Sequence, residues 1–111
     1  MVSKPLVWVG STRDDVRAFP PAVRRLVGRE LDLLQNGRTP MDSRSMPSIG
    51  AGVWELRVRA GGAFRVLYVG KFEESIYVLH AFQKKSRKTS RNDLSIGESR
   101  YREVVRQRGE G

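Results

Sequence analysis

The sequence predicts an α+β fold, in which a mostly antiparallel, four-stranded sheet is packed against two N-terminal helices and a C-terminal helix. Three observations lead to this prediction. Three strand-like segments follow one another in the second half of the chain, separated by short turn signals. An apolar stripe at helical spacing precedes them, and a helix-like segment follows them. With 111 residues, the chain is long enough for a single domain over residues 1–111 but short for two.

The N-terminal third predicts one strand and two helices. Residues 5–9 (PLVWV) are apolar with a β-branched bias, as in a strand. Ser11 is placed to cap a short helix, which ends near Pro20 and Pro21 because proline disrupts the interior of a helix. A second helix follows, with an apolar stripe on one side and a C-terminal signal at Asn36. The stripe consists of Val23, Leu26, Val27, Leu31 and Leu34.

An irregular connection separates these helices from the strands. Residues 38–52 contain two prolines and two glycines with little periodicity, so we expect a long loop without regular structure. Three predicted strands follow at 53–60, 63–71 and 75–83. Because their separators are short, we expect these strands to be consecutive antiparallel neighbours. The tail from 92 to 107 is predicted to be helical, with Ser90 or Asn92 as its cap.

The turn between the first two of these strands decides which side chains share a face of the sheet. A three-residue turn places Arg57 opposite Arg65, whereas a two-residue Gly-Gly turn would put Arg57 among apolar side chains. Burial of an unpaired guanidinium is costly, so we expect the three-residue turn. One face is then apolar and holds Trp54, Leu56, Val58, Phe64, Val66, Tyr68, Tyr77, Leu79 and Ala81. The opposite face is polar and holds Glu55, Arg57, Arg59, Arg65, His80 and Phe82.

The basic composition predicts a polyanionic partner. The chain has 21 Lys and Arg against 12 Asp and Glu, which gives a net charge of +9. A small domain with this charge typically meets RNA or DNA, although an arginine-rich surface can also reflect genome composition or solubility. The absence of cysteine suits a reducing cytoplasm, and we expect a cytoplasmic protein. No signal peptide or membrane-spanning run is visible, so no membrane partner is expected.

The polar face carries residue types that bind a nucleic-acid backbone. Arginines grip phosphate oxygens with a planar fork, and Phe82 is placed to stack on a base. Histidine titrates near neutrality, so His80 is a candidate general acid or base; the alternative is a half-buried strand histidine bonded to the backbone. Glu55 is a candidate proton acceptor, or else the counter-ion of the neighbouring arginines.

Five cations follow within eight residues at the exit of the last strand: Lys84, Lys85, Arg87, Lys88 and Arg91. The first two extend the polar face, and the other three are candidates for contacts with an RNA backbone or ribosomal RNA. One histidine and no cysteine leave no tetrahedral zinc cluster, and carboxylates on the polar face are too few for a two-metal nuclease. We therefore expect no metal or cofactor. RNA cleavage would proceed by attack of a ribose 2′-OH on the adjacent phosphate, with cations stabilising the phosphorane.

The stretch VWELRVRAGGAFRVLYVGKFEESIYVLHAFQKKSRKT resembles the RelE/HigB-like toxins of bacterial type II toxin–antitoxin modules, in particular their phage-derived branch. The hallmarks are an E-L-R strand, an F-R-V-L-Y strand and the block YVLHAFQKKSRKT. The upstream helices and the loop with MPSIGAG also fit, so the resemblance covers roughly residues 4–106. The chain departs from several members of the superfamily at its end, VVRQRGEG, which lacks their C-terminal catalytic His or Tyr.

The resemblance implies a RelE-like fold and an mRNA interferase, that is, an endoribonuclease that cuts mRNA in the A site of the 30S ribosomal subunit without a metal. It also implies a cognate antitoxin as partner, often a helix-turn-helix repressor. By motif position, the residues assigned to catalysis are Arg57, Arg65, His80 and Lys84. The residues expected to contact RNA are Arg59, Phe82, Lys85, Arg87, Lys88 and Arg91.

Two other kinds of function are compatible with the same residues. One is a non-catalytic nucleic-acid- or ribosome-binding module, because a fold does not dictate a function. The other is an interaction protein whose basic face serves only its antitoxin. A mutual placement of Arg57 and Arg65 across two strands favours the endoribonuclease, since binding alone tolerates looser placement of charge.

Overall fold

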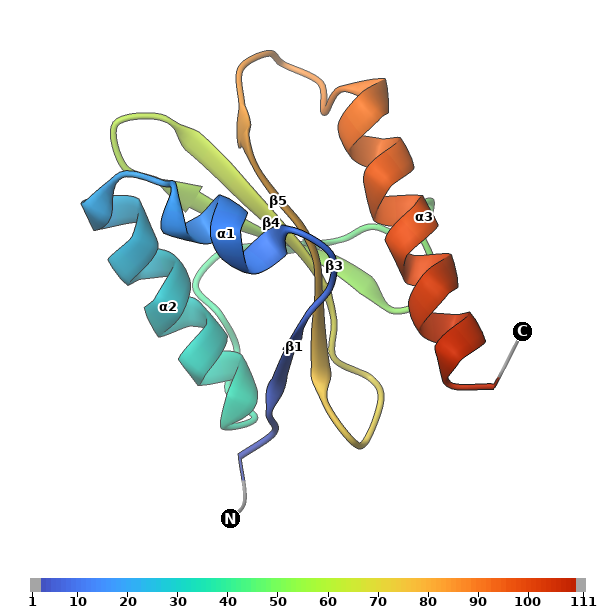
Figure 1. The fold of residues 1–111 in the computed structure, drawn as a ribbon. Coiled ribbons are helices and arrows are strands. Elements are labelled where there is room, and N and C mark those ends of the chain that lie inside the picture. Colours follow the sequence, from blue (N-terminus) through green and yellow to red (C-terminus); the bar gives the residue numbers. More distant parts are fainter. Residues whose placement is uncertain (1–2, 110–111) are drawn as a thin grey trace.

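The computed structural model describes residues 3–109, and over this range the chain forms five strands and three helices (Figure 1). The N-terminal half contains β1 (Leu6–Trp8), α1 (Thr12–Arg17), α2 (Pro21–Gln35) and β2 (Ser43–Ser45). The C-terminal half contains β3 (Val53–Arg59), β4 (Ala63–Val69), β5 (Ile76–Lys84) and α3 (Arg91–Gln107). The strands form one sheet in the order β1-β5-β4-β3-β2, in which β1 is parallel to β5 and the other pairs are antiparallel.

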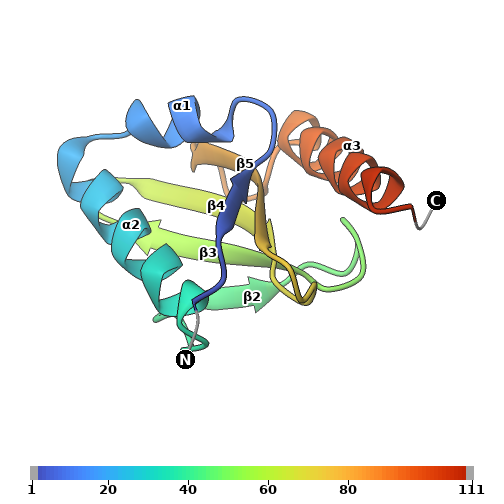
Figure 2. The ribbon, with the colours of Figure 1, turned by 60° about the horizontal axis from the view of Figure 1, so that its bottom comes forward.

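The predicted α+β architecture is confirmed, because α1 and α2 lie on one side of the sheet and α3 lies on the other (Figure 2). The apolar stripe of α2 packs on side chains of β3 and β4, with Val23, Val27 and Leu31 fully or almost fully buried. On the opposite face, Val104 of α3 is buried against a second apolar cluster. The sheet therefore has a hydrophobic core on each face, and α3 covers only part of the second face.

The connection between α2 and β3 contains a strand that the sequence did not reveal. Within residues 3–109 the sheet has five strands rather than the predicted four, because β2 pairs with β3 at one edge. This strand has three residues, Ser-Arg-Ser, and so lacks the apolar alternation that marks a longer strand. Backbone hydrogen bonds hold its flanks: Met46 N–H donates to the Val53 carbonyl at 2.8 Å and Arg57 N–H to the Asp42 carbonyl at 2.9 Å.

The β3–β4 hairpin has the predicted register. Arg59 pairs with Ala63, which leaves a three-residue turn, and Arg57 pairs with Arg65 further along the ladder. Gly61 in the turn has a φ of +69°, a left-handed conformation that glycine adopts easily because it has no Cβ. The two arginines therefore lie on the same face of the sheet, as predicted.

Strand β5 contains a bulge. Leu67 pairs with His80, but the next residue of β4, Tyr68, pairs with Val78, so that Leu79 is an extra residue in β5. An extra residue of this kind shifts the alternation of side chains by one position. As a result Val78 packs beneath α1 and α2, whereas Leu79 packs in the cluster beneath α3.

The predicted apolar face is therefore wrong in part. Tyr77 and Leu79 lie in the cluster on the α3 side, whereas Ala81 packs beneath α1 and α2 as predicted. The reason is that β5 is apolar or aromatic at every position from Ile76 to Leu79. The alternation of polar and apolar residues that normally specifies the register of a strand is absent there.

The C-terminal end of α3 is tied to the connection between β4 and β5. Arg108 donates from Nε to Glu74 Oε2 at 2.5 Å and from Nη2 to Oε1 at 3.1 Å. Its guanidinium lies 3.8 Å from the centroid of the Phe72 ring. The hydroxyl of Tyr77 donates to the same carboxylate at 2.8 Å. The hydrogen bond from Arg108 is the main cause that lowers the pKa of Glu74, to about 2.

We expect Glu74→Gln to lower the melting temperature in a pH-dependent way. A carboxylate whose pKa is depressed by folding stabilises the protein above its unfolded pKa, here 4.5, and this contribution is lost as the pH falls through about 2. The difference in melting temperature between wild type and variant should be largest near neutral pH, shrink below pH 4.5 and vanish near pH 2. Circular dichroism across this range measures it. Glu73→Gln is the control, and a pH-independent deficit for Glu74→Gln would contradict the prediction.

Two helical glycines give a matched test of the packing of α3. A Cβ at Gly28 would meet nothing within 4 Å, whereas a Cβ at Gly97 would lie 2.8 Å from Leu67 Cδ1. We expect Gly28→Ala to raise the free energy of unfolding by about 1 kcal/mol through helix propensity. Gly97→Ala should gain nothing or be destabilising, because Leu67 has to move. Urea unfolding compares the two, and equal stabilisation would argue against close contact between α3 and β4.

Candidate functional site

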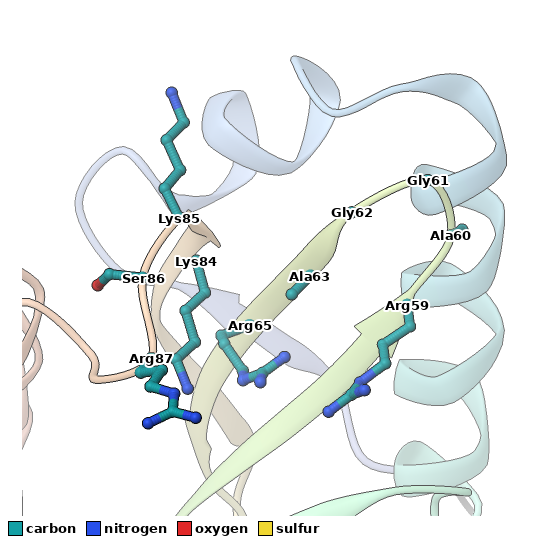
Figure 3. Close-up of a pocket in the computed structure, with 10 residues that line it drawn as sticks. All are labelled: Arg59, Ala60, Gly61, Gly62, Ala63, Arg65, Lys84, Lys85, Ser86 and Arg87. Carbon is teal, nitrogen blue, oxygen red and sulfur yellow. The ribbon is translucent and has the colours of Figure 1, made fainter.

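A basic pocket lies where the β3–β4 turn meets the end of β5 (Figure 3). It is an open hollow of ≈ 780 Å³, and no acidic residue lines it. The turn contributes small residues, which leave room between the strands. The cations that line the pocket are Arg59, Arg65, Lys84, Lys85 and Arg87. A concave surface with one sign of charge concentrates the field and attracts counter-ions of the opposite sign.

Arg65 is the buried member of this group. Only 3% of it is exposed, and its Nη1 donates to the Phe64 carbonyl at 3.1 Å. Its Nε lies 3.5 Å from Oε1 of the buried Glu55 on β3, so Glu55 occupies the position of a counter-ion. Burial lowers the pKa of Arg65, and the Glu55 carboxylate opposes that shift. Nε is buried and has no hydrogen-bond partner within the described residues, and the bond to Phe64 uses a single N–H of Nη1, so the donors left for an anion are on the two Nη atoms.

The other cations of the pocket come from different elements. Arg59 lies at the end of β3, Lys84 at the end of β5, and Arg87 in the connection to α3. Figure 3 shows the side chains of all three extending into the space around Arg65, whereas Lys85 points away from it. The register explains why Lys84 takes part: it pairs with Ala63, two residues before Arg65 on the same face of β4.

Arg57 lies outside this pocket, although it pairs with Arg65 in the sheet. Its Nη2 is 3.0 Å from Asp42 Oδ1, and its Nε donates to the same oxygen at 3.1 Å. Asp42 directly precedes β2, so the strand that the sequence did not reveal brings this counter-ion to Arg57. The two arginines expected to act together thus have separate carboxylate partners in this structure.

His80 is buried and does not line the pocket. It is 6% exposed, and its Nε2 lies 2.7 Å from Oδ1 of Asp93 in the first turn of α3. Because an ionised carboxylate only accepts hydrogen bonds, Nε2 carries the hydrogen and donates. Nδ1 is buried and has no partner among the described residues. Of the two interpretations of His80, the strand histidine with a hydrogen-bond partner inside the protein is closer to the observed geometry than an acid or base that faces RNA. The partner of His80 is a carboxylate, however, and not the backbone.

Sequence reasoning did not select Asp93 or Asp42. Asp93 could have been suspected from the Ser90-x-x-Asp93 spacing, which places an acidic residue in a helical first turn behind a serine cap. The predicted cap at Ser90 is confirmed, because its Oγ accepts from the Asp93 N–H at 3.0 Å. No local pattern connects Asp93 to His80 or Asp42 to Arg57, since both contacts join residues of different elements.

The remaining predicted RNA contacts divide by burial. Phe82 is 8% exposed, and its ring stacks on that of His80 with centroids 4.9 Å apart. In this arrangement the ring is not offered to a base, so the expected stacking does not fit. Lys88 and Arg91 are exposed on the connection and at the start of α3, but they do not line the pocket. Their contact with RNA stays a prediction.

Two further features of the described chain concern metal binding and membrane-spanning helices. Within residues 3–109, His, Asp and Glu side chains nowhere gather in a group of three or more that could hold a metal ion. In the same range no helix combines the length and apolar character needed to cross a membrane. The expectation of metal-independent chemistry stays a prediction.

The fold and the site define a small α+β domain with a basic pocket at one end of its sheet. Residues 14–102 match the family model described as phage derived protein Gp49-like (DUF891), so the chain belongs to this family. The match includes every residue of the pocket and both residues of the His80–Asp93 pair. A search of curated proteins found no match. Membership in this family is consistent with the toxin role in a toxin–antitoxin module.

The two arginine–carboxylate pairs differ in burial, so we expect removal of the carboxylate charge to lower the free energy of unfolding by different amounts. Glu55→Gln removes the counter-ion of a buried guanidinium, so we expect a loss of about 3 kcal/mol in the free energy of unfolding. Asp42→Asn affects a partly exposed pair, and we expect a loss of about 0.5 kcal/mol. Chemical denaturation of both variants measures the difference. Similar losses for the two would show that Arg65 is solvated in solution and not buried as described.

Proposed function

We propose that this chain is the toxin of a toxin–antitoxin module and acts as a ribosome-dependent, metal-independent mRNA endoribonuclease. The observation that carries the proposal is the basic pocket built around the buried Arg65, in which every charged lining residue is a cation. A guanidinium with spare donors, held rigidly by a sheet, suits the binding of a phosphodiester through two parallel hydrogen bonds. The surrounding side chains would supply further positive charge to a phosphate that gains negative charge during cleavage.

The reaction would be an internal transfer at phosphorus. The ribose 2′-oxygen attacks the adjacent phosphorus and loses its proton, the bond to the 5′-oxygen breaks, and that oxygen takes up a proton. The products are a 2′,3′-cyclic phosphate and a free 5′-hydroxyl. Arg65 and Lys84 would contact the non-bridging oxygens, where charge develops, and preorganised donors at this position are among the larger contributions to catalysis. Arg59 and Arg87 would hold the flanking backbone.

The partners follow from the charge and from the resemblance. Messenger RNA in the A site of the 30S subunit is the proposed substrate, and the cytoplasm is the proposed location. The cognate antitoxin is proposed to be a helix-turn-helix protein that neutralises the toxin. The asymmetry of charge supports an anionic partner at this end of the sheet, because seven cations lie in the pocket, on the connection beside it or at the start of α3: Arg59, Arg65, Lys84, Lys85, Arg87, Lys88 and Arg91.

A second candidate is a non-catalytic module that binds a nucleic acid, the ribosome or an antitoxin. The observation in its favour is that the pocket is lined by cations, small residues and one serine, with no carboxylate or histidine among them. Such a lining binds phosphate but offers neither a carboxylate nor an imidazole as a general acid or base. The two candidates therefore differ in whether RNA is cut, and this can be measured directly.

We expect induced expression of the wild-type protein in bacteria to arrest growth and to create new mRNA 5′ ends. The double variant Lys84→Ala/Arg87→Ala should reduce cleavage by about 100-fold. Mapping of 5′ ends with a matched growth curve measures both effects. These side chains are more exposed than Arg65, so their removal should leave the fold intact. Arg102→Ala, an exposed cation of α3 outside the pocket, is the control and should behave as wild type. Growth arrest without new 5′ ends would refute the endoribonuclease and leave the binding module.

A further inference from the structure

One wall of the pocket is made by a segment with few hydrogen bonds of its own. Residues 85–90 connect β5 to α3, and they contribute Lys85, Ser86 and Arg87 to the pocket. Inside this segment the described structure contains one hydrogen bond, from Ser86 Oγ to the Lys88 carbonyl at 2.8 Å. The position of these cations therefore depends on how the two ends of the segment are held.

The far end of the segment is held by Asp93. Its Oδ2 accepts from Ser90 Oγ at 2.7 Å, and its N–H donates to the same hydroxyl at 3.0 Å. Its Oδ1 accepts from Nε2 of His80 at 2.7 Å. One carboxylate thus joins the last residue of the connection to the middle of β5. This bridge closes a loop of chain that contains all the cations from Lys84 to Arg91.

The other end of the bridge, His80, is connected through Phe82 to Arg65, the buried cation of the pocket. The ring of His80 stacks on Phe82, and Phe82 pairs in the sheet with Arg65. His80 therefore contacts the sheet neighbour of the buried arginine on one side and, on the other, the carboxylate that holds the end of the cationic segment. With Nε2 engaged by Asp93 and Nδ1 buried, neither ring nitrogen is placed to exchange a proton with a ligand in the pocket.

The geometry points to Asp93 and His80 as a positioning pair for the RNA site: together they hold the cationic segment 85–90 in the arrangement that receives the phosphate backbone. This inference rests on the proposed function for its ligand, a single-stranded RNA. It assigns a role to Asp93 and changes that of His80, which acts through Asp93 and Phe82 and not as an acid or base. The chain of contacts is Arg65, Phe82, His80, Asp93 and Ser90.

Binding of a fluorescein-labelled, single-stranded oligouridylate to the purified chain tests the first half of this inference. Asp93→Ala should weaken binding about tenfold, the loss expected when one charge-assisted contact is misplaced. Asp93→Asn should recover most of the affinity, because its amide oxygen still accepts from His80. Asn92→Ala, at the adjacent exposed position of the same helical turn, is the matched control and should stay within about twofold. Wild-type affinity in a folded Asp93→Ala variant would overturn the inference.

Backbone ¹⁵N relaxation tests the same point without RNA. In Asp93→Ala the order parameters of residues 85–89 should fall, whereas those of Gly61 and Gly62 on the opposite wall of the pocket should not change. A variant that is globally destabilised would lower both sets, so this comparison separates positioning from stability. If residues 85–89 stay as ordered as in wild type, the pair does not position them and the inference is wrong.

His80→Gln distinguishes positioning from proton transfer. The glutamine amide can donate to Asp93, so we expect RNA affinity to be largely retained, cleavage to fall less than about tenfold and the pH–rate profile to keep both limbs; loss of an acid or base costs about 10²–10⁴-fold and removes a limb. A 100-fold loss of cleavage with unchanged affinity would overturn the inference. If wild type binds the oligonucleotide but cleaves nothing, even on ribosomes, the proposed endoribonuclease fails, and affinity and relaxation still decide the positioning role.

Discussion

The site depends on one extra residue in the central strand β5. Leu79 is not matched in β4, so the side chains on either side of it obey opposite alternations. Before the bulge, Val78 fills the core beneath α1 and α2; after it, His80, Phe82 and Lys84 lie on the opposite face with Arg65. Without the bulge, a strand that buries Val78 in that core would also direct Lys84 into it. The bulge allows one strand to serve a hydrophobic core at one end and a cationic pocket at the other.

Electrostatics set the second constraint. Burial of Arg65 is unfavourable, and Glu55 at 3.5 Å is close enough to offset the charge but does not satisfy its Nε–H. The exposed cations around it repel one another, which lowers the stability of the folded state. A bound anion would reduce this repulsion. A ligand that binds only the folded state would stabilise the protein by mass action. The charges of the pocket thus lower the stability of the fold and raise its affinity for a polyanion. The two hydrophobic cores stabilise the fold enough to offset this cost.

Helix α3 makes contacts at both ends of the sheet. Its first turn carries Asp93, which bonds His80 beside the pocket, and its last turn leads to Arg108, which bonds Glu74 at the opposite end of the sheet. Between them Gly97 lets the helix approach Leu67 closely. The face of the sheet that carries α3 therefore has two parts. Helix α3 covers the apolar part, and the cations of the pocket lie on the part that α3 leaves uncovered.

The sequence by itself determined the class of fold, the order of the main elements and the register of the β3–β4 hairpin. These follow from local signals: the apolar stripe of α2, the prolines before it, and the cost of burying Arg57. It also identified the cations of the pocket, because charge is visible in composition and spacing. Only the tertiary structure decided which of them meet. The four-residue apolar run from Ile76 to Leu79 has no alternation, so the bulge could not be read from it. The short strand β2 has no apolar pattern at all. Asp42, Asp93, the buried Phe82 and the enclosed His80 take their roles from contacts between distant elements, and no local periodicity records such contacts.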